Sequence, residues 1–191
     1  MTVATWDTMG WILYREGKLE EAERYLKAAW LNAQSVTMAE HLAEVAVAKG
    51  NKDEALTTYE LGLATISPYD MMGKKKPAGA EEKKLQGRAD ALRKAGAHSS
   101  IHDATSQLRV IRTIPLGAAK GLDGVAEYRL LLSGGKVVRA EKTGTKELVG
   151  AEDRLKEAKL NQFWPAESEA NLVRNGMLNC HSGVCELVLE P

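Results

Sequence analysis

Hydrophobic residues between Trp6 and Ala64 recur at helical spacing, and the pattern occurs twice at one constant offset, the separation between Trp6 and Ala39. Self-similarity at such a period is typical of helical repeat proteins. The two copies would occupy about residues 3–35 and 36–68. The overlay brings these positions together: Trp6 on Ala39, Met9 on Leu42, Gly10 on Ala43, Gly17 on Gly50, Glu21 on Glu54, Ala22 on Ala55 and Leu26 on Tyr59.

Each copy is predicted to form a helix, a tight turn and a second helix. The first helix runs from about Thr5 to Glu16, because its apolar residues lie three or four positions apart. Gly17 and Gly50 follow the first helix of each copy, where glycine adopts a left-handed helix end without steric cost. Small residues would let helix axes approach to about 8–10 Å. They occupy equivalent positions in the two copies: Gly10, Ala22, Ala43 and Ala55.

The helical spacing breaks after Ala64. Pro68 and the Gly- and Pro-containing stretch 73–79 predict a loop, because these residues cannot continue a helix at that density. Three lysines in this loop could touch an acidic partner, although so short a run is more often solvated. A further helix over about 80–95, ended by Gly96, is predicted to cap the array.

From Leu108 onward the hydrophobic period changes from 3.6 to 2, which marks a second folding unit. Residues 108–116 alternate as a first strand, and a second strand covers Ala126 to Leu132. The glycines of Ser133-Gly134-Gly135 favour a hairpin turn into a third strand, Lys136 to Lys142.

Helical spacing returns once more from Glu147 to Lys159, ahead of the apolar cluster Phe163-Trp164-Pro165. Two further strands are predicted over about Leu172 to Asn179 and Val184 to Leu189. The fold class is therefore α+β with two domains. A helical repeat domain would span residues 1–96, and a small antiparallel sheet with one packed helix would span residues 97–191.

Several residues of the first copy carry a family resemblance. The order Trp6-x2-Met9-Gly10, followed by Gly17, Glu21-Ala22, Leu26 and Ala29, resembles the tetratricopeptide repeat. The second copy keeps Leu42-Ala43, Gly50, Ala55 and Tyr59 without the Trp. This resemblance implies stacked helical hairpins that bind proteins.

The second unit also resembles known proteins. Residues 126–178, with the Gly-Gly-Lys-Val-Val hairpin and a helix that ends in an aromatic-Pro cluster, are similar to the C-terminal domain of TonB energy transducers. The whole combination looks like the C-terminal end of large bacterial secreted proteins that carry a transglutaminase-like domain upstream. That domain is not in this sequence.

The tetratricopeptide resemblance implies a binding site. In such arrays the first helices of successive repeats line a concave groove. An acidic and aromatic groove is expected, which suits a basic or aromatic-rich peptide better than a carboxylate ligand. Alternatively, the aromatic residues pack against a neighbouring repeat. The matching residues here are Asp7, Trp11, Tyr14, Glu40, Glu44 and Val47.

Composition narrows the function classes. The 191 residues are 44% hydrophobic and 27% charged, which is typical of a globular chain. Lys plus Arg and Asp plus Glu number 26 each, so no net field favours nucleic acid or an anionic membrane.

No apolar run approaches the roughly 18–20 residues that cross a bilayer, so no membrane insertion is expected. A complete chain would be cytoplasmic. Since arrays usually need about three repeats, a longer periplasmic or secreted precursor is also expected.

Cys180 and Cys185 flank a short predicted loop. A disulfide can form if Ser182 and Gly183 lie at a hairpin tip, and it would indicate an oxidising compartment. The alternative is two small buried thiols. A zinc site would need a fourth ligand beside these residues and His181, and none lies at a familiar spacing. We find no nucleophile elbow, phosphate loop or dinucleotide fingerprint, so no catalytic residue, metal or cofactor is expected.

These observations predict a non-enzymatic scaffold that binds a protein or peptide through the face of its helical repeats. An alternative is an accessory C-terminal region of a larger secreted transglutaminase- or protease-like enzyme. A third possibility is a TonB-like periplasmic module that pairs an edge strand with another protein.

Overall fold

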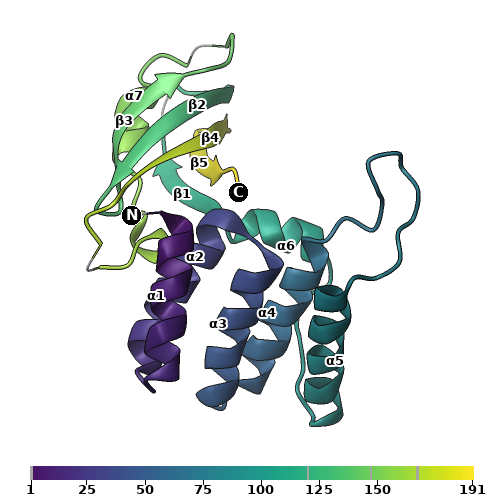
Figure 1. Ribbon diagram of the computed structural model, residues 1–191. Helices are drawn as coiled ribbons and strands as arrows, with labels where there is room; N and C mark the ends of the chain where they lie inside the picture. Colours follow the sequence, from purple (N-terminus) through teal and green to yellow (C-terminus); the bar gives the residue numbers. More distant parts are fainter. Residues whose placement is uncertain (1, 120, 147, 167) are drawn as a thin grey trace.

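The computed structural model describes residues 2–119, 121–146, 148–166 and 168–191. A group of helices comes first in the chain and an antiparallel sheet follows, so the α+β fold class is confirmed (Figure 1). Among the described residues, none of the helices is long and apolar enough to span a bilayer. The helices that precede the sheet are α1 (Val3–Arg15), α2 (Leu19–Ala33), α3 (Val36–Ala48), α4 (Lys52–Ala64), α5 (Ala80–Lys94) and α6 (Ala104–Val110).

The first four helices form two hairpins that keep the offset seen in the sequence. The first residues of α1 and α3, Val3 and Val36, are separated by the same number of residues as Trp6 and Ala39. The first residues of α2 and α4, Leu19 and Lys52, have the same separation. Gly17 and Gly50 take φ values of +77° and +81° just after α1 and α3, where a side chain would strain the backbone. α5 packs against α4 and ends before Gly96, which has a φ of +83°.

Small residues lie where the helices approach one another most closely. A Cβ atom added to Gly10 would lie 2.6 Å from Leu26 Cγ of α2. A Cβ atom on Gly62 of α4 would lie 2.6 Å from Ala39 Cβ of α3 and 3.2 Å from Leu85 Cδ2 of α5. These contacts require glycine for the observed helix spacing. Three alanines at the matching repeat positions are fully buried: Ala22, Ala43 and Ala55.

The sheet has the order β1-β5-β4-β2-β3 among the described residues, with antiparallel neighbours throughout. Alternate residues of β2 from Ala126 to Leu132 are buried, as its period of two predicts. Gly134 and Gly135 have φ values of +54° and +71° and form the tight turn between β2 and β3. The strands are β1 (Thr113–Ala118), β2 (Gly124–Ser133), β3 (Lys136–Lys142), β4 (Asn171–His181) and β5 (Val184–Leu189).

Two elements differ from the sequence prediction. Residues 108 and 110 lie in helix α6 instead of a strand, because the Asp103 side chain accepts hydrogen bonds from the Thr105 and Ser106 amides and begins a helix there. The predicted helix over 147–159 is shortened to α7 (Ala151–Lys156), since Gly150 has a φ of +85° that a helix cannot include. Glu147, where that helix was expected to begin, lies outside the described residues.

One buried apolar cluster extends from the helices into the sheet. Trp6 of α1 is fully buried, donates from Nε1 to Ser168 Oγ at 3.0 Å, and meets the ring of Trp164 edge-on at a centroid distance of 5.0 Å. Asn32 of α2 donates to the Phe163 carbonyl at 2.8 Å, and Arg174 of β4 donates to the Asn32 carbonyl at 2.7 Å. The stretches 1–96 and 97–191 therefore share packing and buried hydrogen bonds.

Candidate functional site

The residues predicted to line the groove lie on α1 and α3. Asp7, Trp11 and Tyr14 belong to α1, and Glu40, Glu44 and Val47 belong to α3. α3 contacts both α1 and α5. These three helices therefore present one surface, which we call the α1–α3–α5 face.

The α1 side of this face is an aromatic stack. The indole of Trp11 stacks on the His41 imidazole, with centroids 4.2 Å apart and planes at 19°. The Tyr14 ring stacks on Trp11 at 4.9 Å. Asp7 Oδ1 lies 3.0 Å from His41 Nδ1 and fixes the orientation of that imidazole. The three rings remain partly accessible to solvent, so the stack is both ordered and available for contact.

The α5 side of the face is a network of ion pairs. Glu40 Oε1 lies 2.6 Å from Lys84 Nζ and 3.6 Å from an Arg88 guanidinium nitrogen. Arg88 also pairs with Glu44. The carboxylates are mostly covered, since the Glu40 and Glu44 side chains are 13% and 20% exposed, whereas Lys84 is 54% exposed. The face is thus charge-balanced instead of acidic, with its cations on the outside.

Tyr59 of α4 supports this network from beneath. Its Oη donates to Glu44 Oε1 at 2.5 Å, and Arg88 donates to the same Oη at 3.4 Å. Burial raises the pKa of the Tyr59 phenol, and the negative charge of Glu40 raises it further. The phenol therefore stays protonated over the ordinary pH range and keeps Glu44 hydrogen-bonded.

The sequence prediction of the face omitted three residues. His41 coincides with Thr8 in the repeat overlay, so the overlay does not assign it to the face. Lys84 and Arg88 belong to α5, which was expected only to cap the array. Each of them immediately precedes a buried residue of α5, Leu85 or Ala89. Because successive residues of a helix lie next to each other around its axis, this spacing predicts that Lys84 and Arg88 lie at the edge of the buried stripe.

Val47 lies near the C-terminal end of α3 and is 40% exposed. It provides an accessible apolar side chain on the helix that carries His41 and Glu44. The α1–α3–α5 face therefore offers apolar and aromatic surface from α1 and α3 and exposed cations from α5, which suits an extended or helical peptide.

The other candidate group is the cysteine pair. Cys180 of β4 is directly opposite Cys185 of β5, and the two form a disulfide with Cα atoms 4.1 Å apart. Ser182 and Gly183, with φ values of +52° and +78°, make the turn between them. His181 lies outside this bond and is exposed. The described residues contain no cluster of three or more His, Cys, Asp or Glu side chains that could hold a metal ion.

Removing the disulfide is expected to lower the free energy of unfolding by about 2 kcal/mol, because the closed loop is short and restricts the unfolded chain only modestly. The measurement is urea denaturation of the oxidised protein and of the double variant Cys180→Ala/Cys185→Ala. Reductant should destabilise the parent protein and leave the double variant unchanged. Equal stability of the parent with and without reductant would show that the bond does not contribute.

Comparison of the chain with models of protein families, with curated proteins and with solved structures gave no match.

Proposed function

We propose that the protein is an interaction scaffold and that the α1–α3–α5 face binds a peptide segment or helix of a partner protein. The aromatic stack of Trp11, His41 and Tyr14 is the observation that carries this proposal. The hydrogen bond between His41 and Asp7 holds the stack in place, and the stack lies on tightly packed helices. Because these side chains are already ordered, a partner could bury them with little loss of side-chain entropy.

The charges of the face suggest how a partner would be oriented. Asp7, Glu40 and Glu44 were expected to select positive charge, but each already has a cationic or imidazole partner within the chain. Affinity would thus come mainly from Trp11 and Tyr14, with Val47 adding apolar contact. The charged groups would set direction and specificity at the rim.

The disulfide supports the second candidate, an accessory C-terminal region of a larger secreted transglutaminase- or protease-like enzyme. The chain has a disulfide, and disulfides persist in oxidising compartments such as the bacterial periplasm. We therefore propose a periplasmic or secreted location for this protein. In that setting the α1–α3–α5 face would position a protein substrate for another domain. The TonB-like candidate relies on the edge strand β3, which could pair with an extended segment. The other edge strand, β1, is less open, because Arg154 donates to its Leu116 and Ala118 carbonyls.

The change Trp11→Ala is expected to weaken peptide binding at least tenfold, the loss of a typical aromatic anchor. The probe is a peptide selected from a random display library on the full chain, and affinity is measured by calorimetry. Because Trp11 is only partly buried, the free energy of unfolding should fall by only about 1 kcal/mol through the lost stacking.

Ile12→Ala is the matched control, since Ile12 is the next residue of α1, is 48% exposed and points to another side of the helix. The control should bind the selected peptide like the parent protein. A Trp11→Ala variant that unfolds would assign Trp11 to the core. A folded Trp11→Ala variant with unchanged affinity would remove the proposed site.

A further inference from the structure

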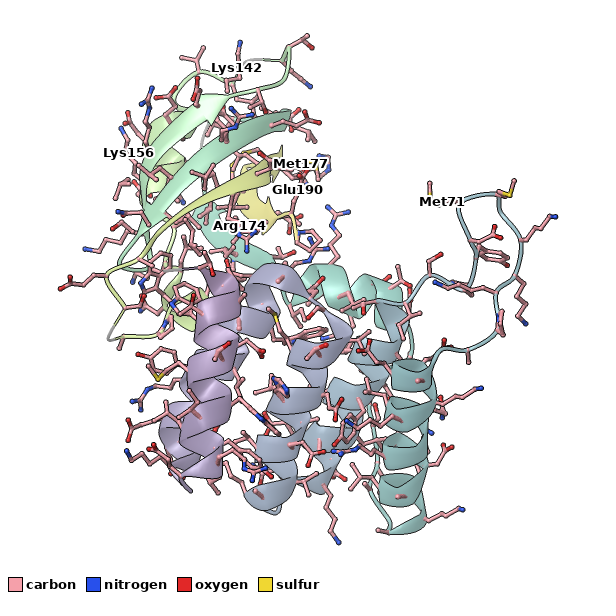
Figure 2. The ribbon with its side chains drawn as sticks, viewed as in Figure 1. Met71, Lys142, Lys156, Arg174, Met177 and Glu190 are labelled. Carbon is pink, nitrogen blue, oxygen red and sulfur yellow. A yellow bond between two sulfur atoms is a disulfide. The ribbon has the colours of Figure 1, made fainter. Side chains whose placement is uncertain are left out.

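The connection between α4 and α5 is an ordered hairpin that projects away from the helices and the sheet (Figures 1 and 2). Its two arms are joined by backbone hydrogen bonds from Lys76 N to Pro68 O at 3.0 Å and from Asp70 N to Lys74 O at 2.8 Å. The Asp70 carboxylate accepts from the Met72 and Lys74 amides at 2.9 and 2.8 Å. The tip is therefore shaped by its own hydrogen bonds.

This hairpin holds apolar side chains out in solvent. Met71 and Met72 have relative exposures of 104% and 80%, and Tyr69 is 55% exposed. Figure 2 shows Met71 at the outer end of the projection. Two adjacent, highly exposed methionines on a hydrogen-bonded tip leave apolar area uncovered, which indicates a binding surface more strongly than single exposed residues do.

Three consecutive lysines follow the tip. Lys74, Lys75 and Lys76 are all exposed, and they occupy the arm that leads back toward α5. Positive charge is thus concentrated next to the apolar tip formed by Met71 and Met72, although the total formal charge of the chain is zero. An apolar tip would enter the boundary between headgroups and acyl chains while lysines behind it meet lipid phosphates.

We propose that the hairpin 67–76 docks the protein on an anionic phospholipid surface, with Met71 and Met72 entering the interface and the three lysines at the phosphates. Protein interfaces are enriched in methionine but depleted in lysine, so the combination fits a lipid surface better than a protein pocket. The docking is peripheral and needs no spanning helix. Because the tip of the hairpin points away from α1 and α3, a docked protein would keep the aromatic stack on these helices accessible (Figure 1).

The test is flotation of the full chain with vesicles of phosphatidylcholine alone or with about one-third phosphatidylglycerol. The parent protein should float with the anionic vesicles and remain unbound with the neutral ones. Met71→Ser/Met72→Ser should lower the partition coefficient at least tenfold. Lys74→Gln/Lys75→Gln/Lys76→Gln should lower it by about fivefold for each lysine, or about 100-fold in total.

Matched controls change the same chemistry elsewhere on the surface. Lys27→Gln/Lys52→Gln/Lys94→Gln removes three exposed charges, and Val149→Ser/Val184→Ser removes two exposed apolar side chains. Both controls should bind anionic vesicles like the parent protein. Equal flotation with the two kinds of vesicle, or hairpin variants that bind as well as the parent, would overturn the proposal and leave a protein partner as the explanation for the exposed tip. Unchanged circular dichroism of the hairpin variants verifies folding.

Discussion

Trp6→Ala is expected to lower the free energy of unfolding by about 3–5 kcal/mol, the range for a buried aromatic residue cut back to alanine. Trp6 is fully buried, and its indole N–H bonds to Ser168 Oγ. Its ring also packs edge-on against Trp164. The change would therefore leave a cavity and remove the indole hydrogen bond to Ser168 where α1 meets the C-terminal half.

The measurement is urea denaturation followed by far-ultraviolet circular dichroism, which reports the helices, and by tryptophan fluorescence. In the parent protein the two signals should change together, because one apolar cluster joins the helices to the sheet. Trp11→Ala serves as the comparison, with a loss of only about 1 kcal/mol. A Trp6→Ala loss no larger than that of Trp11→Ala would contradict the shared core.

Gly62→Val is expected to cost about 3 kcal/mol or more. A Cβ atom at Gly62 would already lie 2.6 Å from Ala39 Cβ, an atom fixed to the α3 backbone, and 3.2 Å from Leu85 Cδ2. Valine adds two further carbons at this point, so α3, α4 and α5 would have to separate. The loss is measured as the change in free energy of unfolding in urea.

Gly87→Val is the matched control because Gly87 lies inside α5, and its added Cβ would have no atom of another described element within 4 Å. Glycine is a poorer helix former than valine, so this change should be neutral or slightly stabilising. Equal effects of the two substitutions would mean that helix propensity, and not close packing, decides the outcome. The helix spacing described above would then be incorrect.

The local signals in the sequence account for much of the helical part and of the sheet. The constant offset between the two copies predicted the spacing of the hairpins, and Gly17 and Gly50 marked the ends of α1 and α3. The alternation in β2 and its two-glycine turn predicted the β2–β3 hairpin. Each of these features depends on neighbours along the chain, so it is visible in a single sequence.

Other features depend on interactions that local patterns do not determine. The apolar residues at 108 and 110 are compatible with a strand or a helix. The segment forms helix α6 because the Asp103 side chain caps its N-terminus. The partner of the Trp6 indole, Ser168, is 162 residues away along the chain. On the candidate face, the aromatic and acidic residues were predicted. The pairing of Glu40 and Glu44 with Lys84 and Arg88 required the position of α5 to be known.

The most direct test of the scaffold proposal is nuclear magnetic resonance mapping of the selected peptide on the isotope-labelled full chain. We predict that the largest shifts occur at the Trp11 indole, the Tyr14 ring and the Val47 methyl groups. The β3 and β1 edge strands should remain unchanged. Shifts confined to an edge strand, with the Trp11 indole unaffected, would contradict binding at the α1–α3–α5 face.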